Sequence, residues 1–292
     1  MTTTIIPAQQ ETINYTATLL SPFHHGAGNS GNTALLRTQD VAQPDGTVAQ
    51  VPFLSAASIR HALRDRIAWH LVSTLDLRPP AVVWSKLGVD LLWTGGSVTS
   101  TGAEVDLGMA RRVEEVFPAL ALFGYSAHSD IVSGTLRASD AILVCRENQW
   151  RIPGAPDTKP AAAWRGEEFG TRHDVASTPV ATLLEQADTL LGSTVKTTQM
   201  IFDTQVLIAG ASLSGQLALQ HGATAAHRTV LGAALALWAP GGEALLGAKT
   251  AQGYGRAAIA GLPDTSADLA AWTAHIADRR DDILQLVEDL TR

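Results

Sequence analysis

The feature that most constrains the fold is the order in which strand-like and helix-like segments follow one another. They are a strand at 13–19, a helix from Ser55 to about residue 71, strands at 135–146, 199–209 and 213–220, a helix at 224–238 and a strand at 256–261. This order predicts an α+β sandwich of the ferredoxin-like kind, with helices on one face of an antiparallel sheet. We also expect a short helix that begins at Pro118 and ends near Gly124, and a final helix capped by Ser266. The sequence has no internal repeat and no clear linker, so we predict one elaborated domain over residues 1–292.

The charge balance limits how the chain can bind nucleic acid. Its formal net charge is −7 and its isoelectric point is near 5.7, so no global basic field attracts an anionic strand. Any nucleic-acid site must therefore be a local groove with its own arginine and lysine side chains.

The single cysteine and the lengths of the apolar runs exclude several protein classes. Cys145 has no second cysteine to pair with, which excludes an internal disulfide and a cysteine zinc cluster. Its alternating apolar setting predicts a buried strand residue. No apolar run approaches the roughly 20 residues that span a bilayer, and the first residues lack the charged and apolar regions of a signal peptide. We expect a cytoplasmic protein with no membrane contact.

A glycine-rich stretch follows the first predicted strand. Residues 26–31 (GAGNSG) match G-x-G-x-x-G. A dinucleotide site also needs a helix that opens at the glycines and an acidic residue about 20 positions later. A polar, hairpin-like stretch follows instead, which disfavours a dinucleotide site. A flexible turn and a loop whose backbone amides approach a phosphate both remain open.

Two groups of basic side chains are candidates for chemistry. His24 and His25 are adjacent, so on an extended segment they point to opposite sides and are not expected to ligate one metal. One of them could act as a general base in an RNase-like reaction, although a loop or groove histidine is favoured. Arg60 and Arg64 share one helix face. They form either a solvated surface beside Asp65 or a phosphate clamp near a helix N-terminus.

Five segments, in this order along the chain, resemble motifs of the RAMP superfamily, the backbone proteins of class 1 CRISPR complexes. They are SPFHHGAGNSGNTALLRTQD (21–40), VPFLSAASIRHALRDRI (51–67), ALALFG (119–124), MIFDTQVLIAG (200–210) and the glycine-rich GAKTAQGYGR (247–256). Each motif alone is weak, but their order along the chain is fairly specific. The chain is most similar to the backbone subunit of type IV complexes.

The resemblance implies a ferredoxin-like (RRM-like) core with a protruding thumb, for which residues 150–198 are the candidate. It implies a non-catalytic subunit that polymerises helically along a guide RNA (crRNA), without a cofactor or metal, in an antiviral or anti-plasmid complex. Its partners would be the guide, further copies of itself, other CRISPR effector subunits and a complementary target paired to the guide.

The resemblance also implies which residues line the RNA groove. They are Gly26, Gly28, Asn32, Arg37, Ser58, Arg60, Arg64, Arg165, Arg172, Lys196, Met200, Phe202, Lys249, Gln252, Tyr254 and Arg256. Met200 or Phe202 would stack on bases, and the cations would hold phosphates.

Two departures from the family pattern concern how closely the RNA backbone can approach the helix and whether the subunit cuts target RNA. His61 stands where relatives usually have glycine. Type III relatives cut target RNA with an aspartate in the loop after the first strand, and the nearest match here is Asn32, with Asp40 close by. Because an amide cannot take a proton as a carboxylate does, we predict no target cleavage. The alternative hypotheses are an endoribonuclease that processes precursor crRNA, with His24 or His25 as base, and a nucleotide-dependent enzyme that uses the first glycine-rich loop.

Overall fold

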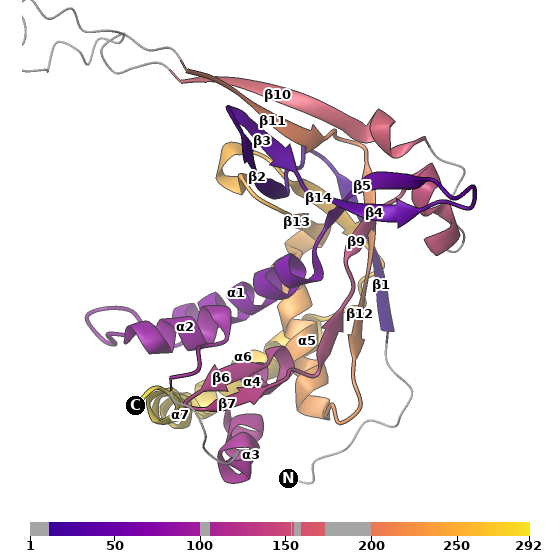
Figure 1. The fold of residues 1–292 in the computed structure, drawn as a ribbon. Coiled ribbons are helices and arrows are strands. Elements are labelled where there is room, and N and C mark those ends of the chain that lie inside the picture. The colour runs from indigo at the N-terminus through magenta and orange to yellow at the C-terminus, as the bar shows by residue number, and fades with distance from the viewer. Residues whose placement is uncertain (1–11, 100–105, 153, 155–158, 173–199) are drawn as a thin grey trace, which may run out of the picture.

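The core of the protein is a four-stranded antiparallel sheet. A computed structural model describes residues 12–99, 106–152, 154, 159–172 and 200–292 (Figure 1). The central strands lie in the order β14 (Arg256–Ala260), β1 (Thr12–Leu19), β12 (Ser212–Leu219) and β9 (Ala141–Leu143), each antiparallel to its neighbour. Numbered along the chain, this order is 4-1-3-2, and the two helices that cover the sheet precede its second and fourth strands. The predicted ferredoxin-like α+β fold is confirmed.

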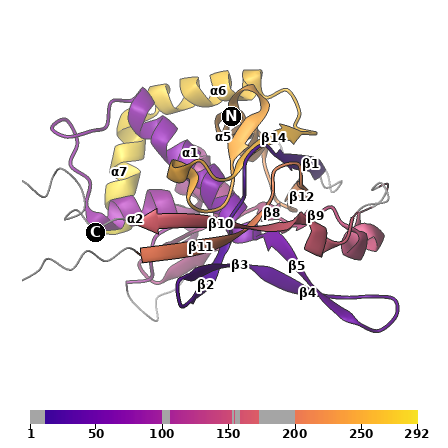
Figure 2. The same ribbon diagram turned by 90° about the horizontal axis from the view of Figure 1, so that it is seen from above.

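Further strands extend this sheet at both edges. They are β13 (Glu243–Leu245) beside β14, β5 (Val48–Leu54) and β4 (Thr38–Ala42) beyond β9, and β8 (Leu136–Ala138), which pairs with β12. Seen from above, the β4–β5 hairpin points away from the C-terminal helix (Figure 2).

Two helices cover one face of the sheet. The first, α1 (Ala56–Thr74), begins where the Ser55 side chain accepts a hydrogen bond from the Ser58 N–H. The second, α5 (Ala225–Trp238), is capped in the same way by Thr224. The alternating side chains of β1 explain the packing, since Tyr15 and its i+2 and i+4 neighbours are buried under the helices.

The remaining helices form a lobe at one end of the molecule, and a second sheet of four strands lies at the opposite end (Figure 1). The lobe contains α2 (Lys86–Thr94), α3 (Leu107–Val116), α4 (Pro118–Phe123), the hairpin β6 (Tyr125–Ala127) and β7 (Asp130–Val132), α6 (Ser266–Asp278) and α7 (Arg280–Thr291). The sequence predicted α4, through its opening proline and closing glycine, and a single helix in place of α6 and α7. None of the helices in the described ranges is long and apolar enough to cross a membrane.

A second sheet stands apart from the helical lobe. Its order is β10 (Arg165–Arg172), β11 (Met200–Leu207), β3 (Thr33–Leu36) and β2 (Gly26–Ser30). Strands β10 and β11 form a long antiparallel ribbon along one end of the molecule (Figure 1). Of the candidate thumb (150–198), the structure describes the end of the 3-10 helix at 146–151, the 3-10 helix at 161–164 and β10. Residues 153, 155–158 and 173–199 lie outside the described residues.

Three local predictions were wrong in part or in full. The strand expected at 135–146 is interrupted, because the Ser139 hydroxyl accepts the Gln216 N–H and Asp140 caps α1 through the Ala56 N–H. Cys145 lies just beyond β9, although it is buried as expected. The cap expected at Ser266 is also wrong, because α6 has no side-chain cap. The single final helix that we expected is divided into α6 and α7.

Candidate nucleic-acid interface around the Gly-rich loop

The Gly-rich loop, defined as residues 247–255, packs against the segment that follows β1. The Ala248 N–H donates to the His24 carbonyl at 2.8 Å. Gly247 has a positive φ of 74°, and a Cβ there would lie 2.4 Å from the same carbonyl oxygen. Glycine is therefore required at this position by close backbone approach.

Lys249, in this loop, lies close to two aromatic side chains. Its Nζ donates to the Thr204 hydroxyl and lies 5.9 Å from the ring centroids of both Phe202 and Tyr254. Thr204 is buried, whereas Phe202 is 36% exposed and its ring lies over Gly170 on the neighbouring strand. One cation and two aromatic rings thus meet where the ribbon faces the Gly-rich loop. Sequence reasoning identified all three of these side chains.

The backbone of Lys249 is unusual for a residue with a side chain. Its φ of 59° and ψ of 25° lie in the left-handed region, which costs about 1–2 kcal/mol for a residue other than glycine. Strained residues of this kind gather at functional sites. The loop is rich in glycine, yet a lysine occupies this left-handed position, which makes its side chain a candidate for a functional role.

Charges around the interface are mixed. Burial, and after it the charge of Glu168, raises the pKa of Tyr254, so its hydroxyl stays protonated at neutral pH. Glu168 lies on β10 directly opposite Thr204. Thr204 was missed by sequence reasoning, although its period-2 spacing from Phe202 places both residues on one face of the ribbon.

The first glycine-rich stretch is a hairpin joined to β11. Gly26 begins β2, and Gly28 adopts a positive φ of 101°. The Arg37 Nε donates to the Gly26 carbonyl at 3.2 Å, and the Asn32 side-chain amide donates to the Ile201 carbonyl at 3.1 Å. Because a strand follows these glycines in place of a helix, the stretch does not have the geometry of a dinucleotide site.

The two histidines are internal. His24 and His25 are 3% and 8% exposed. The His24 Nδ1 is 2.8 Å from the Gln205 carbonyl, and the His25 Nε2 accepts the Ser55 N–H at 3.4 Å. Burial, and after it the nearby Arg37 charge, lowers the pKa of His25 to about 4. His25 is therefore neutral at physiological pH, and both rings join the post-β1 segment to its neighbours.

The helix arginines contact the end of α4 and not the Gly-rich loop. The Arg60 Nη2 donates to the Phe123 carbonyl at 2.6 Å, and the Arg64 Nη2 donates to the same oxygen at 2.8 Å. The interpretation of this pair as a solvated face is wrong, because both side chains are half-buried and hydrogen-bonded to the end of α4. Ser58 lies two residues before Arg60, and its hydroxyl is 3.0 Å from that of Ser55.

Three other predicted residues lie on the surface. The Arg165 guanidinium donates to the Gln50 carbonyl at 2.8 Å, at the start of the ribbon. Arg256 forms an ion pair with Glu243 across β13 and β14 at 2.8 Å. Gln252 is exposed in the Gly-rich loop. Arg256 is therefore already neutralised by a protein carboxylate.

The last three predicted residues lie at or beyond the end of the ribbon. Arg172 and Met200 face each other as backbone partners at the ends of β10 and β11. Lys196 lies outside the described residues. In the described part of the chain, no group of three or more His, Cys, Asp or Glu side chains could hold a metal ion.

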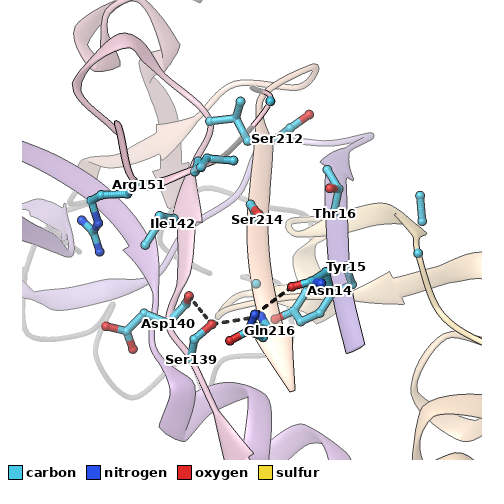
Figure 3. A pocket seen from close by; sticks show the side chains of 16 residues that line it. Asn14, Tyr15, Thr16, Ser139, Asp140, Ile142, Arg151, Ser212, Ser214 and Gln216 are labelled. Carbon is cyan, nitrogen blue, oxygen red and sulfur yellow. Dashed lines mark hydrogen bonds between the residues drawn. The ribbon is translucent and has the colours of Figure 1, made fainter. Parts of the chain in front are cut away.

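The open face of the core sheet carries a different chemistry. A shallow hollow of about 1190 Å³ lies there, and small polar side chains such as Thr16 and Ser214 line its floor (Figure 3). The Gln216 amide donates to Asn14 at 2.8 Å across the strands. Among the described residues that line it, Tyr15 is the only aromatic one, and its ring packs edge-on against a tryptophan of α5. The described residues of this face therefore offer no aromatic platform on which bases could stack, unlike those of RNA-recognition sheets.

The chain resembles known proteins in structure and not in sequence. No protein-family model matches the chain, and no curated protein matches it in sequence. Solved structures do match, among them a chain of a structure described as "Type IV-B CRISPR Complex", with 20% sequence identity and a TM-score of 0.53. The match covers 85% of this chain and 89% of that chain. The two proteins therefore share a fold over most of their length.

Proposed function

We propose that this chain is a guide-RNA-binding backbone subunit of a class 1, type IV-like CRISPR ribonucleoprotein. The observation that carries the proposal is the convergence of Lys249, Tyr254 and Phe202 between the Gly-rich loop and the ribbon. Its context is a ferredoxin-like fold that also occurs in a type IV-B CRISPR complex. The subunit would assemble in the cytoplasm with further copies of itself and other effector subunits, and a target strand would pair with the guide.

The chemistry of this interface suits a single strand. The Lys249 ammonium neutralises a phosphate, and the rings of Phe202 and Tyr254 present faces on which bases stack without sequence preference. The hairpin that contains Gly26, Gly28 and Asn32 pairs with β11 through β3, so these residues remain predicted guide contacts beside the ribbon.

The other predicted contacts divide into two groups. Arg37, Arg165 and Gln252 are exposed and remain predicted guide contacts, as do Arg172, Met200 and Lys196. Ser58, Arg60 and Arg64 line a different part of the molecule, and Arg256 would have to exchange Glu243 for a phosphate.

We propose a structural role without catalysis. A general base must reach the proton that it removes and must be in the right protonation state. His24 and His25 are buried and hydrogen-bonded to backbone groups, which favours a structural role over that of a base. The alternative, an endoribonuclease that processes precursor crRNA, predicts cleavage of repeat RNA that is lost when both histidines are changed to alanine.

A fluorescence-anisotropy titration with a labelled single-stranded RNA tests the interface. Changing Phe202 or Tyr254 to alanine should weaken binding by about tenfold, because stacking on an aromatic ring contributes about 1–3 kcal/mol per base. The matched control is Phe169→Ala, which removes a ring that is 74% exposed on the opposite face of the same ribbon. Equal affinities for all four proteins would contradict the proposed interface.

A further inference from the structure

A small cavity lies where the helical lobe meets the core. Its volume is about 240 Å³, and it is bordered by α3, α4, the β6–β7 hairpin, the segment before β8 and the start of α5. Four of its described lining residues lie three or four positions apart on α3 and therefore share one face of that helix. They are Leu107, Ala110, Arg111 and Glu114. Because a cavity of about 150 Å³ can hold benzene, this one has room for a small organic ligand.

A buried nitrogen in the lining has no hydrogen-bond partner. His227 is 1% exposed, and its Nδ1 accepts the Thr224 N–H at 3.0 Å. Burial lowers the pKa of this imidazole to about 4, so the ring is neutral at physiological pH and carries its one proton on Nε2. Among the described residues, no acceptor bonds to this Nε2–H. Since buried donors are normally satisfied, the ring indicates a ligand that accepts a hydrogen bond.

A hydroxyl in the same lining is also unpartnered. The Thr135 Oγ1 is buried and has no hydrogen-bond partner among the described residues. The backbone of Thr135 is held on both sides, because its N–H donates to the Ala121 carbonyl at 3.2 Å and its carbonyl accepts the Gln220 N–H at 2.8 Å. The hydroxyl is therefore kept beside the cavity while its own hydrogen-bonding capacity is unused.

Two opposite charges at the cavity are not paired with each other. Arg111 and Glu114 lie three residues apart on one face of α3, yet within the described ranges no ion pair joins them, and Arg111 forms none with another carboxylate. The Glu114 Oε1 lies 3.8 Å from the His227 Nε2, beyond the roughly 2.7–3.2 Å of an N–H···O hydrogen bond. The cavity thus presents a free cation, a free carboxylate and two unused neutral groups together.

We propose that this cavity binds a free α-amino acid. The ammonium of the ligand pairs with Glu114, and its carboxylate accepts hydrogen bonds from Arg111, His227 and Thr135. A guanidinium can form two parallel hydrogen bonds to a carboxylate. The two charged groups of an α-amino acid are attached to the same carbon, which suits a cation and an anion one helical turn apart. The rest of the described lining is mostly apolar and suits a small apolar side chain.

The inference goes beyond the proposed RNA interface and does not depend on it. The described lining of this cavity shares no residue with the cluster of Lys249, Phe202 and Tyr254. Failure of amino-acid binding would therefore leave the RNA interface standing, and the reverse also holds.

The first test is a thermal-shift screen of the full chain with each of the twenty common amino acids. A ligand that binds only the folded state raises the melting temperature, so at least one amino acid at about 10 mM should do so. Isothermal titration calorimetry then compares that amino acid with its N-acetyl form, which lacks the ammonium, and its amide form, which lacks the carboxylate. Each analogue should bind about tenfold more weakly, because each loses a charged contact.

Three variants locate the binding at this cavity. Glu114→Gln and Arg111→Gln each remove one charge, and Ala110→Leu fills part of the space. The matched control is Glu115→Gln, which changes the next residue of α3, an exposed carboxylate outside the described lining. The three variants should bind the amino acid about tenfold more weakly, and the control should bind like the wild type.

Three results would overturn the proposal. The first is a wild-type protein that none of the amino acids stabilises. The second is an affinity for both analogues equal to that for the parent amino acid. The third is binding by all three cavity variants that matches binding by Glu115→Gln.

Discussion

Replacing Lys249 by glycine separates RNA binding from folding in the Gly-rich loop. The change removes a left-handed non-glycine residue, which should stabilise the fold by about 1 kcal/mol. It also removes the hydrogen bond to the buried Thr204 hydroxyl, which costs about 1 kcal/mol. The two effects offset each other, so the free energy of unfolding should change little. RNA binding should weaken, because the cation between the two aromatic rings is lost.

The assay is RNA affinity as a function of salt, measured together with urea unfolding. Loss of one charge-assisted contact of about 1.5 kcal/mol weakens binding roughly tenfold. For single strands, each phosphate contact contributes about 0.7 to the slope of log affinity against log salt, so the slope should become shallower by about that amount. Lys86→Ala, which removes a lysine paired with Asp90 on α2, is the control. An unchanged affinity and slope in Lys249→Gly would refute the role given to this lysine.

Three further predictions concern stability, each measured by urea unfolding. Gly255→Ala should destabilise the protein by about 2 kcal/mol or more, because φ is +76° and the new Cβ would lie 1.9 Å from the Leu246 carbonyl; wild-type stability would contradict this. Burial lowers the pKa of His227 to about 4, so the neutral form is favoured in the folded state; stability is complete above about pH 6.5 and should fall by about 3 kcal/mol toward pH 4. His227→Gln should lose less stability than the wild type over this pH range. If the stability of the variant and of the wild type depended on pH in the same way, protonation of His227 would be excluded as the cause. Arg64→Ala should cost about 2 kcal/mol because the carbonyls at the end of α4 lose a charged donor, whereas Arg64→Lys should cost less.

Elements with local signals could be predicted from the sequence. Strand β1 shows period-2 alternation, α1 and α5 begin at Ser55 and Thr224, and α4 lies between a proline and a glycine. These signals depend on neighbouring residues only, so they are readable without the fold. The order of the elements was then sufficient to predict the ferredoxin-like core.

Elements that depend on distant partners could not be predicted. Strand β10 shows no apolar alternation because it is largely exposed, and its pairing is with β11. The parallel contact of β3 with β11 joins segments about 170 residues apart, for which the sequence holds no local signal. The single helix expected after Ser266 divides at Arg279, although its apolar stripe continues.

The candidate site was predictable in composition but not in geometry. Helical spacing places Arg60 and Arg64 on one face, but it does not say that this face meets the end of α4. Similarly, the motif at the Gly-rich loop identifies Arg256 without its partner Glu243, which lies across a strand pair. The meeting of Lys249 with Phe202 depends on how the second sheet docks on the core.

The central claim, that this protein is a guide-RNA-binding assembly subunit, is tested most directly by purifying it and asking what comes with it. The measurement is ultraviolet absorbance for nucleic acid together with particle size, followed by sequencing of the extracted strand. We predict RNA of defined length on a particle much larger than one chain. A nucleic-acid-free monomer that takes up no added RNA at low salt would contradict the account.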